Sequence, residues 1–239
     1  MRGPAIGIMA KAPLPGLAKT RLAATFGAEA AARLAEAMLA DTAGIVRGLC
    51  VAAYAFVTPA QHCASVSSLV RLPALPQEEG DLGRRLAAAF ETLFARGHAP
   101  VVLIGTDTPH LPQACLRSVL ALACTNPEAA VVGPAEDGGY WAIALSRPRP
   151  ALFEAIPWST PRVLEATRRA AAAIGILLLE GPVSFDIDTA QDLIRFGAEA
   201  WEQGHAAPRT AAVAAALIAS RQGARVPTVA AGTGEETSS

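Results

Sequence analysis

Short apolar segments alternate with amphipathic ones along this chain, and this alternation limits the fold more than any other feature. The segments that read as strands are 4–10, 51–57, 100–106, 129–135, 139–145 and 174–180. Helical spacing, capping residues and stop signals predict helices over 27–48, 64–70, 81–97, 111–123, 159–173, 189–203 and 209–221. Strands that alternate with helices need crossover connections, which favour a mostly parallel sheet. The sequence therefore predicts a three-layer α/β/α fold.

The chain of 239 residues is long enough for one such domain, and it contains no internal repeat or clear linker. We expect residues 1–221 to form a single domain and residues 222–239, which end in GTGEETSS, to be a disordered tail. In the helix expected over 159–173, Ser159 or Thr160 is the predicted N-cap.

The bulk composition argues against several classes of partner. The net charge is −1 and the hydrophobic fraction is 52%, so the chain as a whole does not attract nucleic acid or anionic lipid. No apolar run approaches the roughly 20 residues that span a bilayer. The four cysteines match no zinc or redox spacing, and we expect reduced thiols in a cytoplasmic protein. The oligomeric state stays open.

The loop after the first predicted strand, KAPLPGLAKTRL, concentrates positive charge. It carries Lys11, Lys19 and Arg21, and Gly16 allows a tight turn or a close approach to a ligand. Backbone N–H groups up to Thr20 would open a short helix, where an anion binds favourably. The loop is neither a Walker A loop nor a G-x-G-x-x-G fingerprint, because its glycine spacing fits neither. It is either an exposed, solvated basic loop or a polyphosphate site.

The strand at 100–106 leads directly into Asp107, in the segment GTDTPHL. An aspartate at the carboxyl end of a buried strand is a candidate Mg²⁺ ligand, because hard oxygen donors suit a divalent ion that bridges phosphates. The alternative is a turn cap before Pro109. His110 is expected at the surface or facing the substrate.

The segment VSFDIDTAQDL places Asp186 and Asp188 on the same side of an extended chain. Asp192 falls near the start of the next helix, where the helix dipole favours a carboxylate. We expect one of Asp186 and Asp188 to cap that helix and the other to bind metal. Asp188 is the first choice for metal and Asp186 the second.

Two further segments are candidates for substrate contact. Asp137, Gly138 and Gly139 are typical of a hairpin turn, and the two glycines also permit a ligand to approach the backbone. Trp158, in IPWST, is either a pocket wall or part of the core.

With these residues in view, the sequence resembles the GT-A-type nucleotidyltransferase and glycosyltransferase superfamily. It is most similar to a bacterial family of glycosyltransferase-like proteins described as selenodomain-associated transferases. More distantly it resembles 2-phospho-L-lactate guanylyltransferase and the molybdenum-cofactor nucleotidyltransferases. The matching segments lie in order between residue 4 and about residue 203: KAPLPGLAKTRL, GTDTPHL, EDGGYWAIAL, IPWST and FDIDTAQDL. One departure is APLPGLA, which stands where many members have a glycine-rich loop.

The resemblance implies a GT-A-like sheet that binds a nucleoside triphosphate or nucleotide sugar over the first loop, with Mg²⁺ or Mn²⁺ as cofactor. It implies metal ligation by Asp107 and Asp188, and phosphate contacts from Lys11, Lys19 and Arg21, with Lys19 and Asp107 as the catalytic pair. We expect Gly16 and Thr20 to complete the nucleotide loop. The expected substrate-side residues are Asp137, Gly138, Gly139 and Trp158.

The expected reaction is nucleotidyl transfer from a nucleoside triphosphate to a small phosphorylated or carboxylated acceptor, with release of pyrophosphate. Glycosyl transfer from a nucleotide sugar is the alternative, since it uses the same phosphate loop and metal. A nucleotide-binding protein without turnover is the alternative of another class. The base and the acceptor are not determined by the sequence.

Overall fold

A computed structural model of the protein describes residues 2–203 and 207–223. In this part of the chain seven strands form one sheet in the order β3-β2-β1-β4-β6-β5-β7. The strands are β1 (Ala5–Lys11), β2 (Ala52–Thr58), β3 (Ala74–Pro76), β4 (Val101–Ile104), β5 (Ala130–Pro134), β6 (Tyr140–Leu145) and β7 (Leu178–Glu180). Only β6 runs antiparallel to its neighbours β4 and β5, so the prediction of a mostly parallel sheet is confirmed.

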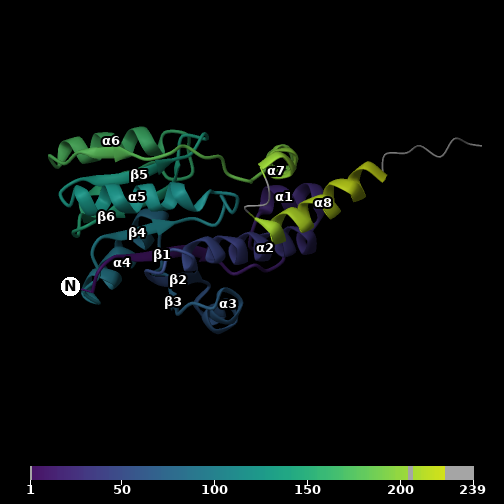
Figure 1. The fold of residues 1–239 in the computed structure, drawn as a ribbon, viewed down its shortest axis with the longest axis horizontal. Coiled ribbons are helices and arrows are strands. Elements are labelled where there is room, and N and C mark those ends of the chain that lie inside the picture. Colours follow the sequence, from purple (N-terminus) through teal and green to yellow (C-terminus); the bar gives the residue numbers. More distant parts are fainter. Residues whose placement is uncertain (1, 204–206, 224–239) are drawn as a thin grey trace, which may run out of the picture.

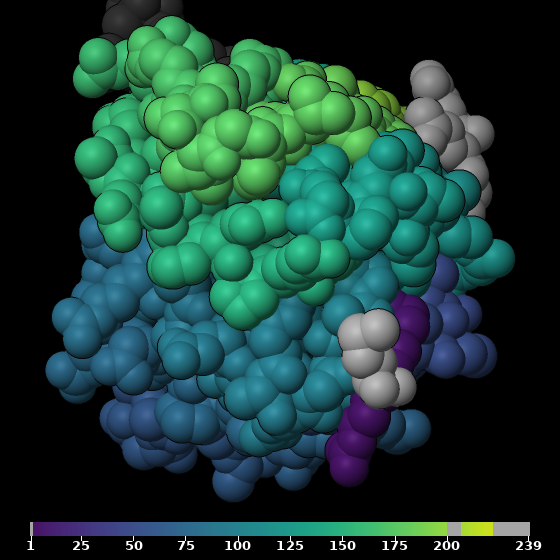
Figure 2. All heavy atoms as spheres, turned by 90° about the vertical axis from the view of Figure 1, so that its left-hand side faces the viewer, coloured from purple at the N-terminus to yellow at the C-terminus, as the bar shows by residue number. Residues whose placement is uncertain are grey.

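Eight α-helices are present in the described residues, and they cover both faces and one end of the sheet (Figure 1). They are α1 (Thr20–Phe26), α2 (Ala28–Arg47), α3 (Cys63–Val70), α4 (Leu82–Ala95), α5 (Gln113–Thr125), α6 (Val163–Ala173), α7 (Ala190–Gln203) and α8 (Pro208–Gly223). Two short 3-10 helices are η1 (Ala60–His62) and η2 (Pro150–Phe153). In the end view of Figure 2 the blue and green parts of the chain lie on opposite sides, because β3 and β7 form opposite edges of the sheet.

The strands alternate between two apolar cores, as the period of a pleated strand requires. On β4, Val102 and Ile104 pack in the core that α2, α3 and α5 complete, whereas Val101 and Leu103 face α4 and α6. All four side chains are at most 5% exposed. Burial on both faces explains why these strands read as continuous apolar runs in the sequence.

A third core lies beyond the sheet, where α1, α7 and α8 pack against α2 (Figure 1). It contains Leu34 and Met38 of α2, Phe196 of α7 and Leu217 of α8. Asp41 of α2 fixes the start of α8, since its Oδ2 accepts hydrogen bonds from Thr210 N at 2.8 Å and from Thr210 Oγ1 at 2.9 Å. These contacts of α2 hold the C-terminal helices α7 and α8 against the N-terminal part of the chain.

Several boundaries differ from those that the sequence predicts. Helix α6 begins at Val163, with Arg162 at the N-cap and no side-chain cap, so the prediction of a cap by Ser159 or Thr160 is wrong. Thr160 Oγ1 donates instead to Pro157 O, at 2.7 Å, and Ser159 has a positive φ of 62°. The late strand is limited to β7, and β3 is not predicted from the pattern, whereas the short helix expected to open at Thr20 is present as α1.

The expected disordered tail lies mostly outside the described residues, although helix α8 continues to Gly223. The four cysteines are free. No helix in the described ranges combines the length and the apolar character needed to cross a membrane.

The contact between Asp41 and Thr210 generates a stability prediction. Asp41→Ala leaves the buried N–H and hydroxyl of Thr210 without their acceptor, and we expect the free energy of unfolding to fall by about 2 kcal/mol. Urea denaturation measures this, with Glu91→Ala on the exposed side of α4 as the control. Equal stability of the two variants would show that this cap contributes nothing.

Candidate functional site

A cavity of about 700 Å³ opens at the carboxyl ends of β1 and β4. The loop after β1, the loop after β4 and the segment before α7 all contribute to its wall, as expected for a ligand site in an open α/β sheet. Of the residues predicted from the sequence, those that line it are Lys11, Lys19, Thr20, Arg21, Asp107, Asp137, Gly139, Trp158 and Asp188. Asp186 lines it as well, whereas Gly16 and Gly138 do not.

Lys19 is the central cation of this site. Its ammonium lies 2.7 Å from Asp107 Oδ1 and 2.8 Å from Asp188 Oδ1, and it donates to Ile187 O at 2.7 Å. All three ammonium protons therefore have an acceptor. The side chain is only 7% exposed, so the interpretation of an exposed, solvated cation is wrong for Lys19. Burial opposes the charge, but the two carboxylates outweigh it and raise the pKa of Lys19.

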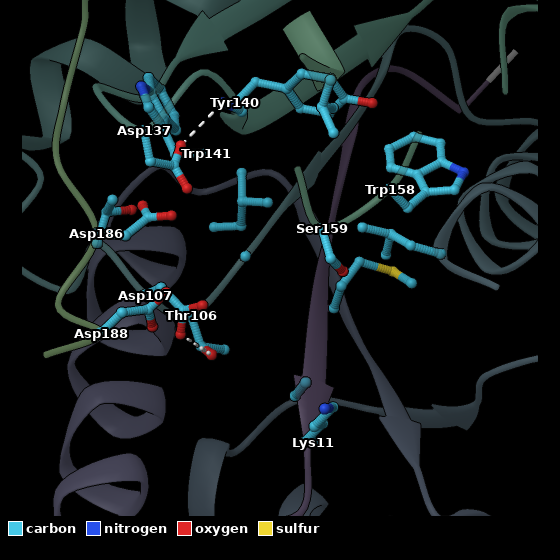
Figure 3. A pocket seen from close by; sticks show the side chains of 18 of the residues that line it. Lys11, Thr106, Asp107, Asp137, Tyr140, Trp141, Trp158, Ser159, Asp186 and Asp188 are labelled. Atoms are coloured by element: carbon cyan, nitrogen blue, oxygen red, sulfur yellow. Dashed lines mark hydrogen bonds between the residues drawn. The ribbon is translucent and has the colours of Figure 1, made fainter. Parts of the chain in front are cut away.

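Three carboxylates converge in this part of the cavity (Figure 3), and two of them contact the ammonium of Lys19. Asp107, Asp186 and Asp188 each offer one oxygen, and these oxygens lie within 4.8 Å of one another. Burial, followed by the charges of Asp107, Asp137 and Asp188, raises the pKa of Asp186 to about 7. Such a set of oxygen donors fits a hard divalent ion such as Mg²⁺ or Mn²⁺. Both Asp186 and Asp188 lie beside Asp107, so each of them is placed to bind the same metal ion as Asp107.

Local packing explains why both carboxylates point into the cavity. Ile187, between them, is fully buried in the third core, and its N–H donates to Asp107 O at 2.9 Å. The prediction that Asp186 or Asp188 caps α7 is wrong. Thr189 and Asp192 form a reciprocal capping box instead: Thr189 N donates to Asp192 Oδ2 at 2.7 Å, and Asp192 N donates to Thr189 Oγ1 at 3.3 Å.

The segment between β5 and β6 is a hairpin turn, as its Asp-Gly-Gly sequence predicts. Asp137 Oδ1 accepts a hydrogen bond from Gly139 N at 2.9 Å. Gly138 has a φ of 87°, and a Cβ there would clash with the carbonyl oxygen of Pro161. Gly138 thus allows the turn to pack against the start of α6, which is a structural reason for a glycine at this position, while Gly139 lines the cavity.

Trp158 lies across the cavity from the carboxylates (Figure 3). Trp158 and Tyr140 pack edge to face with their ring centroids 6.4 Å apart. Trp158 lies against Gly83 of α4, where a Cβ would come within 2.7 Å of its Nε1. Both aromatic residues line the cavity, so Trp158 is a pocket wall that also packs on the core.

His110 occupies a different environment from the one expected. Its ring centroid is 4.3 Å from that of Phe185 and 5.7 Å from that of Phe196. Both ring nitrogens are buried without a hydrogen-bond partner among the described residues, and burial lowers the pKa of His110 to about 4. His110 is therefore a half-buried ring that packs on Phe185 and Phe196, and its two nitrogens are shielded from solvent.

The cavity also includes residues that the sequence does not single out, among them Gln77, Leu82 and Arg85. They belong to the segment that joins β3 to the first turn of α4. A polar residue directly after a strand is a candidate site residue, and Gln77 occupies such a position. The sequence does not indicate it, because β3 has only three residues and its pattern is too short to recognise.

Comparison with solved structures agrees with this architecture. A protein from Desulfovibrio desulfuricans G20, provisionally described as a nucleotide-diphospho-sugar transferase, is 26% identical, with a TM-score of 0.83, and the match covers 91% of this chain and 97% of that one. A cytidylyltransferase from Leptospira borgpetersenii serovar Hardjo-bovis shares the fold at 14% identity, with a TM-score of 0.53 and coverage of 94% and 95%. A Mycobacterium tuberculosis H37Rv protein solved in complex with manganese shares it at 16% identity, with a TM-score of 0.52 and coverage of 82% and 97%.

Fold and site together define a transferase of the GT-A-like nucleotidyltransferase and glycosyltransferase superfamily, as the sequence motifs predict. Residues 36–160, more than half of the chain, match a protein family described as "Uncharacterized protein conserved in bacteria (DUF2064)". The chain belongs to this family. No protein of curated function matches it by sequence.

The burial of Lys19 generates a prediction in which two cations of the same loop behave differently. Lys19→Met leaves the carboxylates without their counter-charge, and we expect the free energy of unfolding to fall by about 2 kcal/mol in metal-free buffer, a value reduced because both partners are partly exposed. Arg21→Met, at an exposed position, should change it by less than about 0.5 kcal/mol. Urea denaturation at neutral pH compares them, and equal losses would contradict the assignment.

Asp186 generates a prediction of pH dependence. Its folded-state pKa of about 7 lies above its ordinary value of 3.8, so the folded state favours the protonated carboxyl group. The resulting stabilisation is present below pH 4 and is lost as the pH rises through about 7. In chelator, Asp186→Asn should melt higher than the wild type at pH 8, with the difference shrinking toward pH 4. A difference that is constant from pH 4 to pH 8 would refute the shift.

Proposed function

We propose that the protein is a metal-dependent nucleotidyltransferase, which joins a nucleoside monophosphate unit to a small phosphorylated or carboxylated acceptor and releases pyrophosphate. The observation that carries the proposal is the meeting of three carboxylates, Asp107, Asp186 and Asp188, with cations at the carboxyl ends of β1 and β4. A triphosphate needs both kinds of group, because its charge must be neutralised and its α-phosphorus positioned.

In this proposal Asp107 and Asp188 hold Mg²⁺ or Mn²⁺, and Asp186 is the adjacent third ligand. The ion supplies Lewis-acid polarisation of phosphate oxygens and neutralises charge on the leaving pyrophosphate. Lys19 orients Asp107 and Asp188 through its two ion pairs. Since all three of its protons are used, Lys19 in this state acts on phosphate through the carboxylates it positions.

The phosphate contacts then fall to the exposed cations of the first loop. Lys11 and Arg21 line the cavity and are exposed, and Thr20 stands between Lys19 and Arg21 at the start of α1. Gly16 has a φ of 77°, and a Cβ at this position would meet no atom of the described residues within 4 Å. Gly16 therefore serves the turn of the loop and not a close contact.

The reaction needs no protein nucleophile. An oxygen of the acceptor attacks the α-phosphorus, and the bond to the bridging oxygen of the pyrophosphate breaks. The protein's contribution is to align the two reactants and to hold fixed charges around them. Asp137 lies beside Asp186 and accepts a hydrogen bond from Gly139 N, whereas Trp158 lies across the cavity (Figure 3). These three residues line the cavity and are placed to contact the acceptor. Residues 1–221 are proposed to form the single domain that carries the site.

Glycosyl transfer is the second candidate, and the similarity to the Desulfovibrio desulfuricans protein supports it. A divalent ion held by the same carboxylates would then neutralise a departing nucleoside diphosphate. Incubation with nucleoside triphosphates and with nucleotide sugars distinguishes the two, because pyrophosphate is the product only of nucleotidyl transfer.

The metal assignment is tested with Asp107→Asn. We expect the variant to fold, since Asp107 is partly exposed, but to lose the rise in melting temperature that MnCl₂ with a nucleoside triphosphate gives the wild type. Pyrophosphate release should fall by at least 100-fold, about 2.7 kcal/mol of barrier. Glu154→Gln, an exposed carboxylate outside the cavity wall, is the control. A wild type that remains active in excess chelator would contradict the role of metal.

A further inference from the structure

Asp186 is the one carboxylate of the three-carboxylate cluster that has no hydrogen-bond partner among the described residues. Asp107 and Asp188 both pair with the neighbouring ammonium, whereas neither the backbone nor the side chain of Asp186 takes part in a hydrogen bond there. Its carboxylate nevertheless lies beside the other two (Figure 3). The packing of its neighbours in the chain, Phe185 and the fully buried Ile187, must therefore set its direction.

The ring of Phe185 lies between two flat polar groups. The guanidinium carbon of Arg195 is 3.8 Å from the centroid of this ring, and the centroid of the His110 ring is 4.3 Å from it. Two groups at these distances would overlap on one face of the ring, so they occupy opposite faces. His110 follows Asp107 on the loop after β4, and Arg195 belongs to α7. The stack thus connects the segments that carry two of the carboxylates.

The guanidinium of Arg195 is itself fixed by a two-pronged ion pair. Its two terminal nitrogens donate to Glu136 Oε2 at 2.6 Å and to Glu136 Oε1 at 2.9 Å, and its Nε donates to Glu199 Oε1 at 2.9 Å. Glu136 belongs to the turn between β5 and β6, and its N–H donates to Ser184 O at 3.0 Å. The turn and the segment before α7 are therefore joined through both backbone and side chains.

The geometry of this pair is more than an exposed ion pair needs for stability. Single-bonded exposed pairs contribute little, but a bidentate pair fixes the plane of the guanidinium as well as its position. That plane lies on Phe185, so a guanidinium in a fixed place restricts the ring, and the ring restricts the next residue, Asp186. Groups that orient a metal ligand in this way commonly change metal affinity without touching the metal.

We propose that Arg195 is a positioning residue for the metal site: its bidentate pair with Glu136 fixes the guanidinium on Phe185, and Phe185 directs the carboxylate of Asp186 toward a divalent ion. The inference rests on the proposed function and deepens it, because it names what determines the affinity of that site for metal. Neither Arg195 nor Glu136 lines the cavity, so each acts on the ion only through Asp186.

The experiment measures Mn²⁺ binding without nucleotide, from the electron paramagnetic resonance signal of free Mn²⁺ during titration with MnCl₂. The variants are Arg195→Met and Glu136→Gln, which break the same pair but change the net charge in opposite directions. We expect both to bind Mn²⁺ about tenfold more weakly than the wild type. Charge alone predicts opposite effects, since the loss of a cation favours Mn²⁺ and the loss of a carboxylate disfavours it.

Two further variants separate geometry from charge and from folding. Arg195→Lys keeps the charge but has neither the fork nor the planar face, so it should also bind Mn²⁺ at least about fivefold more weakly. The double variant Arg195→Met with Glu136→Gln should be within about twofold of the weaker single variant, because both changes remove one interaction. All should fold, since both residues are exposed, and melting temperatures in chelator check this.

The matched controls are Arg169→Met and Glu165→Gln. These residues form another exposed arginine–glutamate pair, at 2.8 Å on α6, and they lie outside the cavity wall. Their replacement should leave the affinity for Mn²⁺ within about twofold of the wild type.

Each contrary result has a distinct meaning. Wild-type affinity in Arg195→Met, with or without a lower melting temperature, shows that the pair serves stability alone and overturns the inference while the proposed function stands. Tighter binding by Arg195→Met, or wild-type binding by Arg195→Lys, shows that charge and not geometry acts, and this also overturns it. Losses that multiply in the double variant refute the shared pathway through Phe185. A wild type that binds no Mn²⁺ overturns the proposed metal site and this inference together.

Discussion

The ammonium of Lys19 connects parts of the chain that are up to 169 residues apart, and the geometry of the whole site depends on it. It stands between Asp107, which follows β4, and Asp188, which precedes α7. Two carboxylates at this distance repel each other unless a cation lies between them. Lys19 also adopts a left-handed backbone conformation, with φ 52° and ψ 47°, which costs a residue other than glycine about 1 kcal/mol or more. Its ion pairs and its bond to Ile187 O offset that cost.

The packing around Lys19 explains why its ammonium and the two carboxylates have fixed positions relative to one another. Ile187 is fully buried in the third core, so the carboxylates on either side of it are directed into the cavity. Leu22, three residues after Lys19, is fully buried in the same core. The helices beyond the sheet thus fix both the cation and one of its partners. The sheet fixes the other partner, Asp107, at the end of the buried strand β4. Two separately packed regions meet at one ion-pair cluster.

Whether a feature of the fold or site can be predicted from the sequence depends on how far apart along the chain the interacting residues are. The strand and helix alternation is local, and it predicts the parallel sheet, the hairpin before β6 and the meeting of three loops. The burial of Lys19 is not local, because only the folded chain brings Asp107 and Asp188 to it, and the loop by itself reads as a basic surface. The capping box of Thr189 and Asp192 is local, but two nearby aspartates compete with it in the sequence pattern. Gln77 escapes notice because β3 depends on its neighbour β2 and not on its own three residues.

The charge balance of the cavity limits how a polyphosphate can bind there. Lys19 gives one positive charge to three carboxyl groups, of which Asp186 titrates near neutral pH. The carboxylate side of the cavity therefore has a net charge of −1 when Asp186 is protonated and of −2 when it is ionised, and it repels phosphate. Lys11 and Arg21 line the cavity as exposed cations and Arg85 as a partly buried one, but three cations do not balance a triphosphate carrying about four negative charges beside these carboxylates. The same carboxylates that repel phosphate are hard oxygen donors for a divalent ion. Nucleotide and metal are thus expected to bind as one charge-balanced unit, since each corrects the electrostatic imbalance that the other creates.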